Sequence, residues 1–308
     1  MHEAIYEALI FSHSDWRILM MKLQKFAKKI LGCLPDKLYL KIQYRYLTHR
    51  KLNLDPPIRY NEKLQWIKLY DRQPVYTDLV DKYRVKQIVA ERIGEKYVVP
   101  LLAVWDRPMD IDISSLPSQF VIKTNHDSKG VVICRDKAQF DLKKVKSFFE
   151  ERMKVNGYSY GREWPYKNIK RKIFAEKYLE DESGGLIDYK VLCFNGVAKL
   201  IQLHQGRFTK HYTHDIYDVD WNVMPFNQVG ETSSEYPAPK PPFLDEMIEL
   251  AETLSANIPH VRVDWYYVNG QLYFGEMTFF DGAGYFDFVP DEYNEIIGEW
   301  IKLPLVRK

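Results

Sequence analysis

The stretch that most constrains the fold is residues 261–278, VRVDWYYVNGQLYFGEMT. Apolar and polar residues alternate on both sides of Asn269-Gly270, and Val, Tyr, Trp and Phe are frequent, so the pattern predicts a β-hairpin. Four of its polar residues have even numbers: Arg262, Asp264, Glu276 and Thr278. Because side chains alternate along a strand, each pair shares one face of its own strand.

The turn decides whether the two pairs share a face. A two-residue Asn-Gly turn would pair Val268 with Gln271 and direct Asp264 away from Glu276. Both carboxylates come onto one face if the loop has an odd number of unpaired residues or contains a bulge. We expect a three-residue loop, 268–270, with Gly270 at positive φ and Tyr267 paired with Gln271. Trp265 and Tyr267 then lie on the other face.

Two carboxylates that converge beside Arg262 repel each other unless a cation lies between them. Their hard oxygen atoms suit a magnesium ion that bridges nucleotide phosphates. The alternative is a solvated hairpin face on which Arg262 pairs with Asp264 or Glu276. This stretch alone leaves both interpretations open.

Length and charge exclude several classes of protein. The 308 residues can bury a substantial core in two or three lobes of one enzyme-sized unit. The 44 basic and 42 acidic residues nearly cancel, so no nucleic acid partner is expected. Three scattered cysteines, Cys33, Cys134 and Cys193, are too few for a disulfide framework or a zinc site, which favours a reduced cytoplasm.

The N-terminal residues bear on location. No apolar run approaches the ~20 residues that a membrane-spanning helix needs, and the start, MHEAIYEALIFSHSDW, lacks the features of a signal peptide. We therefore expect a cytoplasmic protein. Residues 16–50 interleave apolar residues with Lys and Arg, which fits peripheral contact with the inner membrane surface or a helix packed on the main body. Pro35 interrupts the pattern and favours the packed helix.

Helical periodicity follows from residue 61 to residue 94. We expect one helix capped by Asn61 and a second from Thr77 to Gly94. A short apolar strand within residues 96–106, broken by Pro100, comes next. Helices followed by a strand indicate an α+β or α/β organisation.

A polar loop, TNHDSKG, separates the strand-like runs FVIK and GVVIC within residues 118–136. Such a loop can fold over a ligand, with backbone N–H groups and Ser128 or Lys129 directed at phosphate oxygens. Lys123 ends the first strand, where its ammonium can reach a phosphate. The chain contains neither a GxxxxGK[ST] P-loop nor a Rossmann GxGxxG after a strand.

Residues 172–202 predict a strand, a loop and a hairpin that turns at Asn195-Gly196. A hinge follows the first strand: Glu176, Lys177, Tyr178 and Leu179. A backbone hinge with an acid and an apolar residue can bind adenine and ribose. Asp188 and Lys190 share a strand face, where a second lysine can meet the far phosphate.

In chain order these features resemble the ATP-grasp ligases, specifically the TupA-like ATP-grasp family found among genes for bacterial capsular, O-antigen and teichuronopeptide polysaccharides. The likeness runs roughly from residue 61 to the C-terminus and includes DKYRVKQIVAERIGEKYVVPLLAVWD, FVIKTNHDSKGVVI, FAEKYLED and GEMTFFDGAGY. It implies an α+β ATP-grasp fold in which two α+β lobes grip ATP, preceded by a helical segment. The expected parts are residues 1–60 (basic helical segment), 61–117 (N-terminal α/β lobe), 118–179 (small lobe with the phosphate-covering loop) and 180–308 (central lobe with the metal hairpin).

The resemblance also implies the site. Lys123 would contact the α and β phosphates of ATP, under a loop formed by Ser128, Lys129 and Gly130. The hinge from Glu176 through Lys177 and Tyr178 to Leu179 would bind adenine and ribose. On the strand of Asp188, Lys190 would approach the γ phosphate. Asp264 and Glu276 would hold Mg2+, and Thr278, where many relatives have asparagine, would be a weaker ligand through its hydroxyl.

The implied reaction is ADP-forming amide synthesis. A carboxylate attacks the γ phosphate to give an acylphosphate, which Arg262 stabilises, and an amine then displaces phosphate. The expected substrates are a uronic-acid carboxylate of a surface sugar or glycan and an amino acid or other amine. Two alternatives remain open, a sugar-nucleotide glycosyltransferase and a non-catalytic nucleotide-binding scaffold. The histidines at 204, 211 and 214 fit an acceptor-side or surface cluster better than a metal site.

Overall fold

The computed structural model describes residues 32–180, 187–206 and 210–305, and the chain divides into two compact units, Met1–Lys51 and Leu52–Lys308. In the first unit, helix α2 (Asp36–Thr48) begins directly after Pro35 and ends at His49, which has φ 58°. The basic residues from 16 to 31 lie outside the described part of the chain. Within the described ranges, no helix combines the length and the apolar character needed to span a bilayer.

The second unit contains the rest of the fold and begins before the expected boundary at residue 60. Its first helix is α3 (Tyr60–Tyr70), with Arg59 at the N-cap and the Glu62 carboxylate accepting the Arg59 backbone N–H at 3.1 Å. The predicted cap at Asn61 is wrong. Asn61 is buried in the first turn and donates to Asp287 Oδ1 at 2.8 Å, so a tertiary hydrogen bond has replaced a local one.

The single helix expected from Thr77 to Gly94 is two helices, α4 (Val75–Val80) and α5 (Val85–Ile93). Asp81 separates them, because its carboxylate accepts the backbone N–H groups of Tyr83 and Arg84 at 2.9 and 3.1 Å. The predicted end at Gly94 is confirmed, with φ 111°. The break leaves Lys82 between the two helices, where its backbone N–H donates to the Asn125 carbonyl at 3.0 Å.

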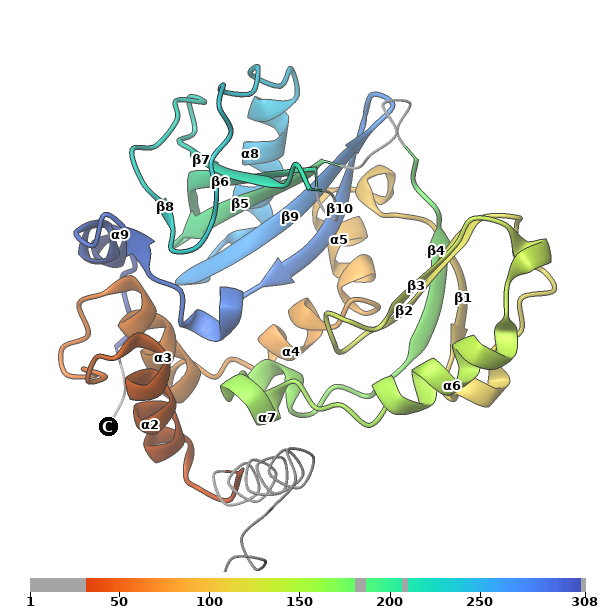
Figure 1. The fold of residues 1–308 in the computed structure, drawn as a ribbon, viewed down its shortest axis with the longest axis horizontal. Coiled ribbons are helices and arrows are strands. Elements are labelled where there is room, and N and C mark those ends of the chain that lie inside the picture. The colour runs from red at the N-terminus through yellow and green to blue at the C-terminus, as the bar shows by residue number, and fades with distance from the viewer. Residues whose placement is uncertain (1–31, 181–186, 207–209, 306–308) are drawn as a thin grey trace, which may run out of the picture. The chain divides into compact units, whose positions relative to one another are not determined.

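The smaller sheet is antiparallel and has the order β1-β4-β2-β3 (Figure 1). Its strands are β1 (Leu101–Trp105), β2 (Phe120–Thr124), β3 (Val131–Cys134) and β4 (Ile173–Lys177). Strands β2 and β3 flank the polar loop, as the sequence predicts. Helix α6 (Leu142–Arg152) contributes Val145 and Phe149 to the core that this sheet shares with it, and the short α7 (Tyr158–Gly161) follows.

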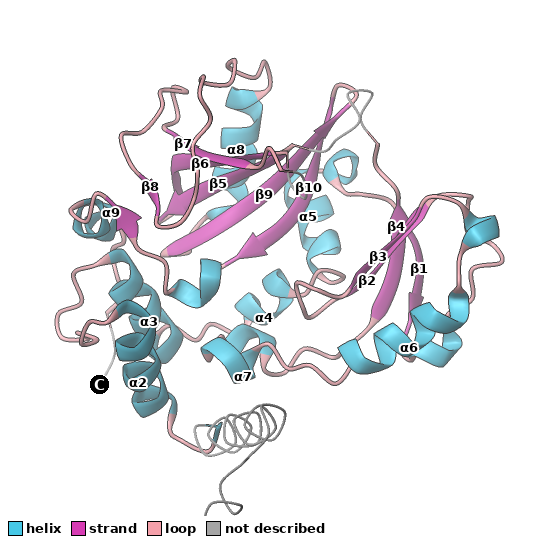
Figure 2. Cartoon of the chain, in the orientation of Figure 1, coloured by secondary structure: helices cyan, strands magenta, loops and turns pink. Residues whose placement is uncertain are grey.

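The larger sheet is also antiparallel, in the order β10-β9-β5-β6-β7 (Figure 2). Its strands are β5 (Asp188–Phe194), β6 (Val197–Gln205), β7 (Thr213–Tyr217), β9 (His260–Val268) and β10 (Gln271–Thr278). The predicted turn between β5 and β6 is confirmed, with φ 52° at Asn195 and 81° at Gly196. Helix α8 (Leu244–Ser255) packs on β5, β6 and β9, and its Met247 joins Val191 and Val263 in the main core.

The turn of the β9–β10 hairpin differs from the prediction. Val268 pairs with Gln271, so Asn269 and Gly270 form a two-residue turn with φ 49° and 85°. The expected three-residue loop is wrong, although the positive φ at Gly270 is confirmed. An Asn-Gly pair accommodates two successive positive φ angles, which match the strand twist, so the shorter turn is favoured.

A bulge in β10 restores the expected face. The register shifts between Phe274 and Glu276 around Gly275, and Asp264 then pairs with Glu276. A Cβ at Gly275 would lie 3.0 Å from the Asp264 carbonyl oxygen, which explains the glycine. Trp265 on the opposite face is fully buried in the main core, as predicted.

Short elements complete the second unit. Strands β8 (Asn227–Gln228) and β11 (Phe288–Val289) form a two-stranded sheet, and α9 (Tyr293–Trp300) packs against α3. Single 3-10 turns are η2 (Glu95–Tyr97), η3 (Pro108–Asp110), η4 (Lys137–Gln139), η5 (Trp164–Tyr166) and η6 (Asp281–Gly284). Arg59, just before α3, pairs with Asp287 and Asp291 at 3.0 and 2.7 Å, which ties both ends of this unit together.

Candidate active site

Arg262 lies at the centre of the polar face of the hairpin. Its Nε and Nη2 donate to the two Asp264 oxygens at 2.7 and 2.8 Å, and its Nη1 lies 2.6 Å from Asp281 Oδ1. Arg262 and Asp264 are only 5% and 7% exposed, so they are not on the solvated surface of the alternative interpretation, although the pairing of Arg262 with Asp264 that it predicted is confirmed. Burial acts to lower the pKa of Arg262, but Asp264 and Asp281 outweigh burial and raise the pKa, so the guanidinium stays charged.

Asp281 is a site residue that the sequence did not reveal. It begins η6, where three consecutive residues are left-handed: Gly282, Ala283 and Gly284, with φ 52°, 55° and 67°. Burial acts to raise the pKa of the Asp281 carboxyl, but Arg262 and Lys190 lower the pKa to about 2. The residue belongs to the stretch GEMTFFDGAGY that carries the family likeness, which is the signal that could have identified it.

Lys82 forms an ion pair with Glu276 and was also missed. Its side chain is 17% exposed, and burial together with the charge of Lys123 lowers its pKa to about 8, against the opposing effect of Asp264. Lys82 therefore connects the helix break to the edge strand of the larger sheet. A lysine in a helical stretch ordinarily lies in solvent, so periodicity gave no signal for it.

Glu176, the first hinge residue, lies on β4 and is 5% exposed. Its carboxylate pairs with Lys123 of β2 and with Lys86 of α5, the latter at 3.0 Å. Burial acts to raise the pKa of Glu176, but the two ammonium groups outweigh it and lower the pKa. The structure thus joins the predicted Glu176 and Lys123 with Lys86, which the sequence did not single out.

Lys190 belongs to the set of charges around Arg262. On β5 it lies directly opposite Asp264 of β9, and it is buried together with Asp188 on the same strand face. Burial and the positive charge of Arg262 lower the pKa of Lys190, while Asp264 and Asp281 oppose that shift. We refer below to the charged cluster, which consists of Lys82, Lys86, Lys123, Glu176, Lys190, Arg262, Asp264, Glu276 and Asp281.

The polar loop between β2 and β3 does not direct its amides outward. The backbone N–H groups of Lys129 and Gly130 both donate to Asp127 Oδ1 at 2.6 Å, and Asp127 also pairs with Arg152 at 2.8 Å. The expectation that these amides face a phosphate is therefore not met in this conformation, because an internal carboxylate occupies them. The side chains of Ser128 and Lys129 are exposed.

The remaining hinge residues continue from Glu176 at the end of β4. The Lys177 backbone N–H donates to the Pro100 carbonyl at 2.9 Å, and its side chain is exposed. Tyr178 and Leu179 are half-buried.

The order of these elements along the chain matches a known family over most of its length. The family model of TupA-like ATP-grasp proteins matches residues 62–302. The chain belongs to the TupA-like ATP-grasp family. This confirms the α+β ATP-grasp fold expected from the sequence.

Solved structures of other ATP-grasp proteins are similar to this family member only in part. D-alanine–D-alanine ligase from Bacillus anthracis, complexed with ATP, is 16% identical with a TM-score of 0.38, covering 65% of this chain and 53% of that one. The Helicobacter pylori D-alanine–D-alanine ligase is 15% identical with a TM-score of 0.41, covering 80% and 69%. The ligase PsnB, complexed with a minimal precursor, is 10% identical with a TM-score of 0.38, covering 71% and 59%.

The chain thus spans 53% of the first of these ligases, and no curated protein matches it. The family assignment rests on the match over residues 62–302.

The ATP-grasp hairpin offers hard oxygen donors for Mg2+. Asp264 and Glu276 lie directly opposite each other on one face, and Thr278 Oγ1 lies 3.4 Å from Glu276 Oε1. Arg262 and Lys82 pair with these two carboxylates, so a metal ion would have to displace Lys82 from Glu276 to use both. In the described residues no three His, Cys, Asp or Glu groups are arranged around one metal position. Two carboxylates completed by phosphate and water oxygens nevertheless suit Mg2+, so the donor set fits.

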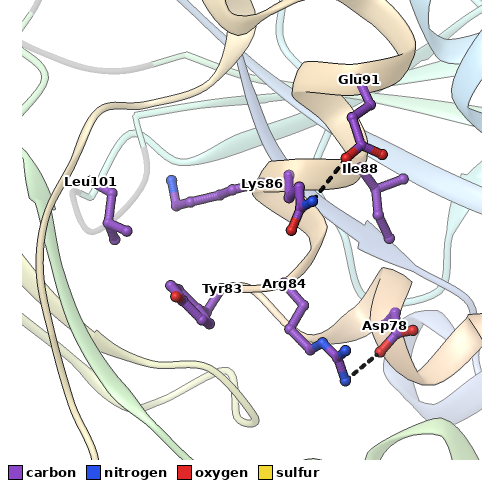
Figure 3. Close-up of a pocket in the computed structure, with 8 residues that line it drawn as sticks. Asp78, Tyr83, Arg84, Lys86, Ile88, Glu91 and Leu101 are labelled. Carbon is purple, nitrogen blue, oxygen red and sulfur yellow. Dashed lines mark hydrogen bonds and ion pairs between the residues drawn. The ribbon is translucent and has the colours of Figure 1, made fainter.

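A cavity of about 420 Å³ adjoins the charged cluster at α5 (Figure 3). Lys86 lines it together with Leu101 at the start of β1. Of its other charged groups, Arg84 pairs with Asp78 at 2.9 Å, and Glu91 accepts a hydrogen bond from Gln87 at 2.8 Å. Lys86 is therefore the residue that this cavity shares with the charged cluster.

Proposed function

We propose that the protein is an ATP-dependent carboxylate–amine ligase that forms an amide through an acylphosphate and releases ADP. One observation, two ion pairs, carries the proposal. Lys82, in the break between α4 and α5, pairs with Glu276 of the larger sheet. Lys123, in the smaller sheet, pairs with Glu176 at the predicted hinge. In this arrangement the carboxylates neutralise the lysines. Triphosphate and magnesium would satisfy both sets of charges at once.

The nucleotide would lie between the hinge and the hairpin. Lys123 and Lys86 would exchange the Glu176 carboxylate for the α and β phosphates, and Lys82 would leave Glu276 for the phosphates as Mg2+ arrives. The segment from Glu176 through Lys177 and Tyr178 to Leu179 would bind adenine and ribose. Lys190 would contact the γ phosphate, and Ser128, Lys129 and Gly130 would close over the phosphates after Asp127 releases the loop amides.

Magnesium would be held by Asp264 and Glu276, with Thr278 beside them, and would neutralise phosphate charge. Arg262 is already fixed by Asp264 and Asp281, so it needs little reorganisation to stabilise the negative charge of the acylphosphate. The substrate carboxylate oxygen would bond to the γ phosphorus while the bond to ADP breaks. The amine nitrogen would then bond to the acyl carbon while phosphate leaves. Of the two protons that an ammonium loses, one leaves on phosphate and one passes to water.

The family likeness extends the proposal to the substrates. The carboxylate would be a uronic acid of a bacterial surface polysaccharide, and the amine would be an amino acid or a related compound. The protein would act in the cytoplasm, with residues 16–50 as a candidate contact with the inner membrane surface. Such a site needs no covalent nucleophile, because positioned cations suffice for phosphoryl transfer.

Trapping the intermediate tests the proposal. The protein is incubated with Mg-ATP, hydroxylamine and D-glucuronate or D-galacturonate, and products are separated by chromatography. We expect ADP, phosphate and a hydroxamate that depends on the sugar carboxylate. Release of AMP and pyrophosphate contradicts the acylphosphate mechanism. Transfer from a sugar nucleotide without ATP would support a glycosyltransferase instead.

A further inference from the structure

The polar face of the larger sheet continues past the charged cluster onto β6 and β7. Gln202 of β6 lies directly opposite Lys190, and His204 lies opposite Asp188. His214 of β7 lies opposite His204, with ring centroids 4.6 Å apart. Since directly paired residues in an antiparallel sheet point to the same side, these side chains share the face of Lys190 and Asp264.

Gln202 is buried without internal hydrogen bonds. It is 1% exposed, and neither Oε1 nor Nε2 has a hydrogen-bond partner among the described residues. Leaving a buried polar group unsatisfied costs about 1–3 kcal/mol. A native fold that retains such an amide next to a buried lysine indicates that a ligand completes its hydrogen bonds.

His214 presents a second unsatisfied atom on the same face. Asn227 Nδ2 donates to the His214 carbonyl at 2.7 Å, so Asn227 Oδ1, 2.5 Å from His214 Nδ1, acts as the acceptor. The Nδ1 atom therefore carries the proton. Burial lowers the pKa of His214 and keeps the ring neutral, which makes Nε2 an acceptor. This atom is buried and has no partner within the described part of the chain.

We propose that Gln202 and His214 form the subsite that binds the amine substrate. Gln202 Oε1 and His214 Nε2 accept N–H groups, and Gln202 Nε2 donates to a neighbouring oxygen of the same molecule. An anion would place its lone pairs against both acceptors, so a phosphate or carboxylate group is disfavoured. The assignment rests on the proposed ligase function and extends it, because Lys190 connects this subsite to the phosphates.

The subsite also fixes where the amine attacks. Paired residues in the sheet have Cβ atoms about 4.5–5.5 Å apart, so a nitrogen held by Gln202 lies next to the group bound by Lys190. The nitrogen lone pair bonds to the acyl carbon as the carbon–oxygen bond to phosphate breaks. Gln202 and His214 bind and orient the nitrogen, and the phosphate oxygen takes the leaving electron pair.

The test compares two buried glutamines. Gln65 is fully buried and bonded, donating to the Gly284 carbonyl at 2.7 Å and accepting from Lys68 at 3.0 Å. Gln65→Met should therefore lower the Tm. Gln202→Met removes an unsatisfied amide, so its Tm should equal or exceed that of the wild type. A Gln202→Met Tm that falls as far as that of Gln65→Met overturns the subsite.

The second readout is the rate of amide formation with Mg-ATP, D-glucuronate or D-galacturonate, and each of the twenty protein amino acids in turn. Gln202→Met removes an acceptor for the amine N–H groups, so KM for the reacting amino acid should rise about tenfold or more, while the rise in Tm on adding Mg-ATP, which reports the phosphate contacts, should stay as in the wild type. His214→Phe should raise the same KM. An unchanged KM, or loss of the Mg-ATP shift in Tm together with the amide, overturns the subsite alone. Absence of hydroxamate with the wild type overturns the ligase function and the subsite with it.

Discussion

Lys82 and Glu276 form an ion pair that joins the break between α4 and α5 to the edge strand of the larger sheet. The same glutamate lies opposite Asp264, so Lys82 pairs with one of the two carboxylates that we propose as metal ligands. The ammonium is only partly exposed and lies near Lys123 and Arg262. A ligand that brings negative charge would therefore draw Lys82 away from Glu276.

Replacing Lys82 by Gln removes this ammonium and should reduce ADP release by on the order of 10²-fold, because a preorganised cation on phosphate is lost. The matched control is Arg84→Gln in the same helix break, whose pair with Asp78 at 2.9 Å is largely exposed. That control should remain within about twofold of the wild type. Equal activities of the two variants would remove Lys82 from the site.

Replacing Glu276 by Gln keeps the shape of the side chain and removes its charge. Wild-type protein with Mg-ATP at about a hundred times Kd should gain about 2.7 kcal/mol of unfolding free energy, and Glu276→Gln should lose most of that gain. Thermal unfolding with and without Mg-ATP measures both values, and Glu235→Gln at an exposed position is the control. A full Mg-ATP shift in Glu276→Gln would leave the carboxylate without a role in metal binding.

The bulge at Gly275 should control activity more than stability. In Gly275→Ala the new Cβ would meet the Asp264 carbonyl at 3.0 Å, so the register at Glu276 should change and ADP release should fall at least about tenfold. Gly270→Ala at the turn has φ +85° and open space, so it should cost about 1 kcal/mol of stability and leave turnover intact. Urea unfolding and turnover of both variants give the comparison, and a greater loss of turnover in Gly270→Ala contradicts it.

Asp281 should make stability depend on acid pH. Its pKa is about 2 in the folded protein against an ordinary pKa of 3.8, so the unfolded chain binds the proton more tightly. Its contribution, on the order of 2 kcal/mol, is present above about pH 4 and is lost as the pH falls toward 2. Urea unfolding between pH 6 and 2 should show a shallower pH dependence for Asp281→Asn. Parallel curves would mean that the pair with Arg262 does not set this dependence.

The strands and their turns were predictable because apolar alternation and Asn-Gly pairs are local signals. The hairpin register was not, since the bulge depends on how closely Gly275 approaches the neighbouring strand. The sequence analysis placed the extra, unpaired residue in the turn of the hairpin. In the structure this residue is Gly275, five positions after Gly270.

Lys82, in the break between α4 and α5, shows a second limit of prediction from the sequence. Asp81 interrupts the helix while accepting from Asn125 Nδ2 at 2.9 Å, a contact with a residue far away in the sequence. Periodicity cannot report such a contact, so Lys82 looked like one more solvated lysine. The lysines at positions 123 and 190 were singled out because Lys123 ends an apolar strand and Lys190 shares a strand face with Asp188.

The separation of the Asn269-Gly270 turn from the Gly275 bulge has a practical consequence for protein engineering. The ladder between them, from Val268–Gln271 to Trp265–Phe274, insulates the register at Asp264 and Glu276 from the tip of the hairpin. A short peptide tag or a fluorophore-bearing residue inserted between Asn269 and Gly270 would therefore leave the carboxylates in place. The hairpin tip is an attachment point for a reporter that leaves the charged cluster undisturbed.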